Sequence, residues 1–180
     1  MKNQNTKKLA YAALFLALCL VLPMLTGQIP QIGSMLLPMH IPVLLCGLVC
    51  GWQYGAAVGF VAPLLRSVLF GMPPMYPVAI AMAFELLTYG LVIGLVYRRM
   101  AQKGAAGVYA ALLTAMVAGR LVWGVAEVVL LGLGGKAFTA QAFLAGALLN
   151  AVPGIIVQLV LIPAMMAALQ KVGAVKEYAE

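Results

Sequence analysis

Four ionisable side chains stand inside long apolar segments of the sequence: Arg66, Glu85, Arg120 and Glu127. A charged side chain at the centre of a membrane helix costs about 2.5–3.5 kcal/mol on insertion scales, so such residues need a reason to be there. Two arginines and two glutamates can form two ion pairs that only hold helices together. An arginine that is not fully used by a glutamate can instead bind the carboxylate of a small solute. Both uses remain open at this point.

Arg120, Trp123 and Glu127 occupy positions i, i+3 and i+7, so they share one face of a helix. Arg120 and Glu127 are too far apart to pair within that helix. Each needs a partner on another helix, and Glu85 and Arg66 are the candidates. An aromatic ring between two charges suits a ligand with both polar and apolar parts. This face is therefore a candidate substrate-binding surface.

Two further residues are candidate pocket residues. His40 lies in the sequence Pro38-Met39-His40-Ile41-Pro42, near an expected membrane interface, and Tyr89 lies one helical turn from Glu85. Each could equally be an ordinary interfacial or packing residue.

Catalytic and metal-binding patterns are not found. The cysteines lie in apolar runs without an acidic or histidine partner at ligand spacing, which favours packing over metal binding. Gly134-Gly135-Lys136-Ala137 lacks the leading glycine and the hydroxyl residue of a nucleotide-binding loop, and there is no His-Glu-x-x-His. We expect no enzymatic activity, no cofactor and no metal.

The composition places these side chains in a membrane. Of the 180 residues, 65% are hydrophobic and only 8% are charged, whereas soluble domains carry about 25% charged residues. Apolar runs separated by glycine, proline and charge clusters predict an all-α bundle of about six transmembrane helices. We expect them at residues 8–26, 38–50, 55–70, 78–97, 107–131 and 140–170, the last kinked or ended by Pro153 and Pro163. A tight turn is expected at 51–55.

Basic residues orient the bundle. Eight of the eleven lysines and arginines fall in the two terminal segments and the 98–106 loop, and only Lys136 falls in a loop on the other side. By the positive-inside rule, both termini are expected to be cytoplasmic. At 1.5 Å per residue, Arg66 and Glu127 then lie roughly 6 Å below the outer surface, and Glu85 and Arg120 roughly 14–16 Å below it, beside Asn150. This clustering favours a cavity that opens outward.

The first helix carries no internal charge but has a small-residue strip. Its Ala13-x-x-x-Ala17 spacing allows another helix to pack closely.

The sequence resembles the substrate-binding S components of energy-coupling factor (ECF) transporters, which take up vitamins in bacteria. The resemblance covers nearly the whole chain and is strongest at 38–45, at 51–55 and from 63 to 74. It implies a single transmembrane substrate-binding domain over residues 1–180, in the bacterial cytoplasmic membrane. Its partners would be a transmembrane T subunit, docked at Ala13 and Ala17, and two ATPase subunits, with no nucleic acid.

The resemblance also implies a pocket made by outer loops and later helices, with Glu85, Arg120, Trp123, Glu127 and Asn150 in range. If the arginines are free, a pantothenate-like anion is the leading substrate. If both are used by glutamates, a neutral or zwitterionic vitamin fits better. A stand-alone secondary transporter or channel, and a membrane assembly or scaffold protein, are the alternatives.

Overall fold

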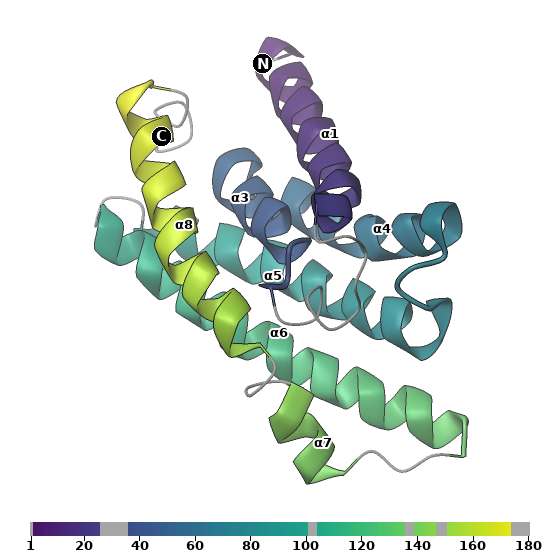
Figure 1. Ribbon diagram of the computed structural model, residues 1–180. Helices are drawn as coiled ribbons and strands as arrows, with labels where there is room; N and C mark the ends of the chain where they lie inside the picture. Colours follow the sequence, from purple (N-terminus) through teal and green to yellow (C-terminus); the bar gives the residue numbers. More distant parts are fainter. Residues whose placement is uncertain (1, 26–35, 101–103, 136–138, 147–150, 174–180) are drawn as a thin grey trace.

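The structure is a computed structural model that describes residues 2–25, 36–100, 104–135, 139–146 and 151–173. Over these residues the chain is largely helical and contains no strand (Figure 1). The elements are α1 (Lys2–Leu25), α3 (His40–Cys50), α4 (Trp52–Phe70), the π-helical η1 (Met75–Ala79), α5 (Ile80–Met100), α6 (Ala105–Leu133), α7 (Ala140–Leu144) and α8 (Val152–Lys171). The predicted all-α fold is confirmed.

In the described part of the chain, five helical segments are long and apolar enough to cross a membrane: Gln4–Leu25, Trp52–Phe70, Met75–Met100, Ala105–Leu133 and Val152–Lys171. The sixth apolar helix, α3, has only 11 residues. Large apolar side chains cover outward faces; on α6, for example, Leu113, Val117 and Leu121 are each at least half exposed. Large exposed apolar faces mark contact with a membrane or with another protein, and segments of this length and composition suit a membrane. The chain is a multi-pass membrane protein.

The predicted helix at 140–170 is wrong as a single element. Helix α7 ends at Leu144 and α8 begins at Val152, with Pro153 in its first turn. Proline is tolerated there because its missing N–H would have no partner in the helix. Pro163, in contrast, lies inside α8 and does not end it. The predicted turn at 51–55 is also shorter: only Gly51, with φ of 97°, breaks the chain before α4 begins at Trp52.

Glycines bring α3, α4 and α5 into close contact at the centre of the bundle. A Cβ added to Gly90 of α5 would lie 2.1 Å from the carbonyl carbon of Gly55 in α4. One added to Gly59 would lie 2.2 Å from the carbonyl oxygen of Leu86. Small residues permit this approach of backbones, and van der Waals contact then stabilises helix packing in lipid.

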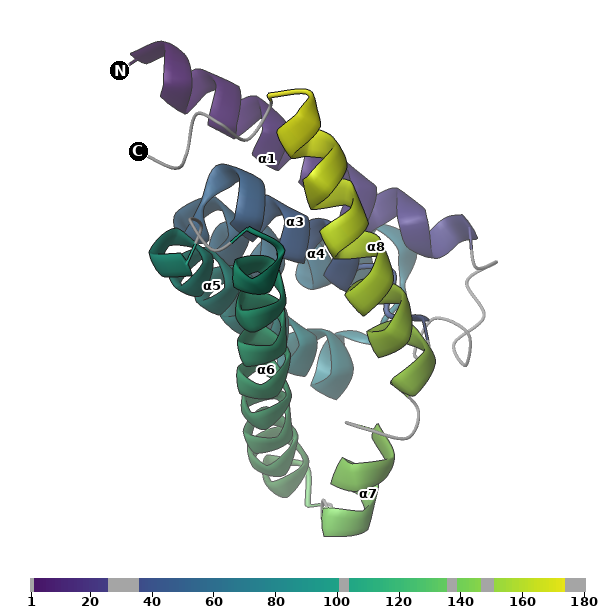
Figure 2. The same ribbon diagram turned by 90° about the vertical axis from the view of Figure 1, so that its left-hand side faces the viewer.

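The remaining helices surround this centre. Helix α6 packs along α5, α1 packs on α3 and α4, and α8 packs on α6 and α3. Figure 2 shows α7 next to the far end of α6, beyond the start of α8. On α1, Ala12 and Cys19 are buried against the bundle, whereas Ala13 and Ala17 are exposed.

Candidate ligand-binding site

Glu85 of α5 lies at the middle of a set of buried polar side chains and is itself only 1% exposed. Nη1 of Arg120, on α6, lies 3.0 Å from its Oε1 atom. Nε2 of His40, at the start of α3, lies 3.4 Å from the same oxygen. The pairing of Arg120 with Glu85 is the one that the sequence suggests. Side chains from three helices thus meet at one carboxylate.

Tyr89 lies one turn along α5 and is also buried. Its ring meets the His40 ring edge-on, with 5.2 Å between centroids. The Tyr89 ring also packs on α6 at Gly119, where an added Cβ would lie only 2.9 Å from its Cε1 atom. Tyr89 therefore holds His40 beside Glu85 and fixes the spacing of α5 and α6. We call His40, Glu85, Tyr89 and Arg120 the buried polar cluster.

Several buried polar atoms have no hydrogen-bond partner among the described residues. In the buried polar cluster they are Nε and Nη2 of Arg120, both ring nitrogens of His40 and Oε1 of Glu85, the last held only by its ion-pair contacts; on α8, Nε2 of Gln158 also has none. A buried polar group without a partner costs about 1–3 kcal/mol, so native proteins rarely leave several together. The unused hydrogen-bonding capacity of these side chains consists largely of donors, which would suit a ligand rich in oxygen acceptors.

Arg66 and Glu127 do not form the second ion pair. In the described part of the chain Arg66 donates a hydrogen bond from Nη1 to the carbonyl oxygen of Leu20, and its guanidinium lies 5.3 Å from the centroid of the Phe70 ring. The hydrogen bond to Leu20 joins α4 to α1, and the two helices pack against each other. Glu127 lies on a different helix, α6. Glu127 is buried, at 6% exposed, and no ion pair joins it to Arg66 in these segments.

Trp123 packs against α7. Its ring stacks on that of Phe143 with 6.1 Å between centroids and 27° between planes. Phe143 also lies over Gly124, where there is no space for a Cβ. Sequence reasoning did not single out Phe143, because α7 was expected to be part of a longer helix. Asn150, the remaining predicted pocket residue, lies outside the described residues.

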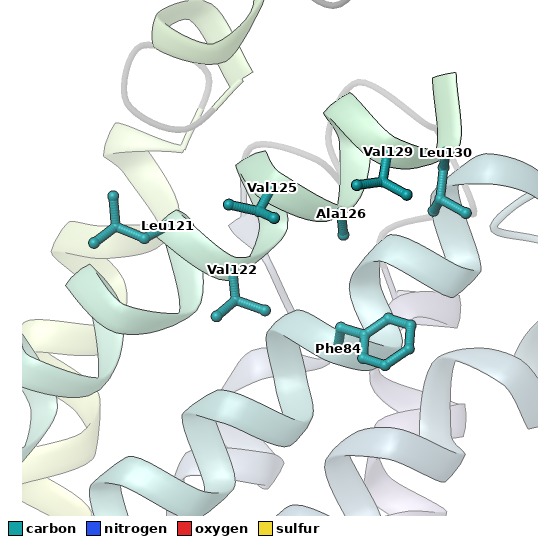
Figure 3. A pocket seen from close by; sticks show the side chains of 7 residues that line it. All are labelled: Phe84, Leu121, Val122, Val125, Ala126, Val129 and Leu130. Atoms are coloured by element: carbon teal, nitrogen blue, oxygen red, sulfur yellow. The ribbon is translucent and has the colours of Figure 1, made fainter. Parts of the chain in front are cut away.

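A hollow of about 400 Å³ between α5 and α6 has a different character (Figure 3). It is lined only by apolar side chains: Phe84, Leu121, Val122, Val125, Ala126, Val129 and Leu130. Arg120, Trp123 and Glu127 are not part of its lining. This hollow has no group that could bind a polar solute, so we do not assign the substrate to it.

The described residues also contain no group of three His, Cys, Asp or Glu side chains that could hold a metal ion. Cys19, Cys46 and Cys50 are buried, and Cys19 contacts the carbonyl oxygen of Met39 at 3.6 Å.

A family model described as the substrate-specific component of ECF transporters matches residues 7–168 of the chain. The chain belongs to this family. Comparisons with curated proteins and with solved structures give no match. As a substrate-specific component of an ECF transporter, the chain is a membrane-embedded transport subunit. The match agrees with the resemblance seen in the sequence, and it covers most of α1, all of α3 to α7 and most of α8.

Proposed function

We propose that this chain captures a small vitamin-like solute in the buried polar cluster and presents it to a separate energised complex. The observation that carries the proposal is the cluster itself: a carboxylate, a guanidinium and an imidazole from three helices meet inside a membrane bundle. If this ion pair served only for packing, all of its hydrogen-bonding atoms would have partners within the protein. Here the two remaining nitrogens of Arg120 are buried and have no partner in the described chain.

For the substrate we propose a small anion, with pantothenate as the leading candidate. Arg120 uses Nη1 for Glu85, which leaves its other nitrogens available. A planar guanidinium with free N–H groups matches a carboxylate better than it matches an ammonium or an apolar group. Arg66, in contrast, is engaged by Leu20 and Phe70. We therefore place the anion at Arg120.

The partners that we propose are a transmembrane T subunit and two ATPase subunits, in the cytoplasmic membrane of a bacterium with both termini of this chain inside. Ala13 and Ala17 are exposed on α1 and carry no long side chain, so they leave a smooth strip for a neighbouring helix.

Uptake in reconstituted vesicles tests this proposal. The chain would be reconstituted alone, and together with its T and ATPase subunits, and supplied with a vitamin mixture that includes pantothenate. We expect ATP-dependent accumulation of one compound only when all subunits are present. Accumulation driven by a proton or sodium gradient in vesicles that contain this chain alone would instead establish a stand-alone transporter.

A further inference from the structure

Gln158 is a buried amide of α8 to which the proposed function gives no role. It lies in the middle of α8, is only 1% exposed, and its Nε2 has no hydrogen-bond partner among the described residues. It belongs to a buried stripe of α8 made by Gly154, Gln158, Ile162 and Met166. An amide in such a stripe is costly unless it meets an acceptor, because neither lipid nor an apolar core supplies one.

Its position relates Gln158 to the buried polar cluster. Helix α8 packs on α3 and α6, which are the helices that carry His40 and Arg120. Near the end of α8, Gln170 donates a hydrogen bond of 3.2 Å to the hydroxyl of Tyr97 on α5. From this contact, Gln158 lies twelve residues back along α8 and Glu85 lies twelve residues back along α5. Each is thus about 18 Å of helix from that contact.

The free atoms of Arg120 have a definite geometry. Nη1 contacts Glu85, whereas Nε and Nη2 are buried and unpartnered in the described chain. Nε and Nη2 form one edge of the guanidinium, and two parallel N–H groups on such an edge bind both oxygens of a carboxylate. The amide of Gln158 is neutral, so it suits an uncharged oxygen.

We infer that Gln158 is a substrate-binding residue. Its Nε2 donates to an uncharged carbonyl or hydroxyl oxygen of the ligand, while the Nε–Nη2 edge of Arg120 holds the ligand's carboxylate. The inference rests on the proposed function and deepens it, because it defines the substrate class: a small carboxylic acid with a second, uncharged oxygen group.

The test compares two glutamines on the same helix. Gln158→Met removes an amide that we assign to the ligand, and Gln170→Met removes one that already has a partner in Tyr97. Each protein is purified in lipid nanodiscs and incubated with the small-molecule fraction of a bacterial cell extract. Retained compounds are identified and quantified by mass spectrometry, and binding of the retained compound is then titrated. Gln158→Glu is included because it keeps the size of the side chain but replaces the donor with a carboxylate.

We expect the wild type and Gln170→Met to retain the same carboxylic acid with equal affinity. Gln158→Met should bind it about tenfold to a hundredfold more weakly, since one buried acceptor loses its donor. Gln158→Glu should bind it still more weakly. Wild-type affinity in either Gln158 variant, equal loss in both methionine variants, or a retained compound without a carboxylate would overturn the inference and leave capture itself intact. If the wild type retains nothing, the proposed function fails.

Discussion

The carboxylate of Glu85 lies 3.0 Å from Nη1 of Arg120, and this contact joins α5 to α6 in the interior of the bundle. Removing one partner of a buried ion pair leaves an uncompensated charge, which costs about 3–5 kcal/mol. Replacing both partners together avoids that cost. Stability and ligand binding can therefore be separated at this pair, because a ligand needs the guanidinium whereas the fold needs only charge balance.

Glu85→Gln and Arg120→Gln should each lower the thermal stability of the purified protein, and the double variant should recover most of the loss. Arg120→Gln and the double variant should not bind the substrate, since both lack the free nitrogens of Arg120. Thermal unfolding and ligand titration on the same samples check this. A stable double variant with wild-type affinity would show that the pair is purely structural.

Assembly with the T subunit should depend on the exposed alanines of α1. Ala13→Leu combined with Ala17→Leu places two bulky side chains on the proposed docking strip, so the T and ATPase subunits should no longer co-purify. Ligand binding should be unchanged, because both residues face away from the bundle.

The matched control lies on α8, where Ala164 and Ala168 have the same spacing and are also exposed. Ala164→Leu combined with Ala168→Leu should leave co-purification intact. Normal assembly of the α1 variant, or equal disruption by both double variants, would argue against docking at Ala13 and Ala17.

Gly90 should tolerate no side chain. In Gly90→Ala the new Cβ would meet the backbone of Gly55 at 2.1 Å, so α4 and α5 must move apart. We expect a loss of at least about 1–3 kcal/mol, seen as a lower unfolding temperature in detergent. Gly132→Ala on α6 is the control, because nothing lies within 4 Å of its added Cβ. Equal stability of the two variants would mean that the glycine contact does not determine packing.

Sequence patterns predicted the helices well where apolar runs are long and bounded by glycine or charge. The second predicted helix, 38–50, corresponds to α3 at His40–Cys50, and the fourth, 78–97, to most of α5. The expectation failed at 140–170, because the sequence there stays apolar and does not reveal where the chain breaks. Pro153 and Pro163 were both expected to kink or end the helix, but Pro153 lies in the first turn of α8 and Pro163 lies inside it.

The ion pair at the centre of the candidate site could be predicted from the sequence, but the partners of the other charged residues could not. An ionisable residue in an apolar run is conspicuous, so Glu85 and Arg120 could be paired by charge and depth. The partner of Arg66 could not be predicted in this way. It is the backbone carbonyl of Leu20, and because every residue has a backbone carbonyl, the sequence does not show which one is used. Gln158 did leave a signal: it is the one polar residue from 152 to 169. Its importance appears only when its burial and its lack of a partner among the described residues are known.

Native mass spectrometry of the purified chain alone directly tests whether the buried polar cluster captures a solute. After incubation with the small-molecule fraction of a bacterial cell extract, without ATP or other subunits, we predict a single bound small molecule on the wild type and none on Arg120→Ala. The absence of any bound compound on the wild type, or equal binding by Arg120→Ala, would contradict capture in the buried polar cluster.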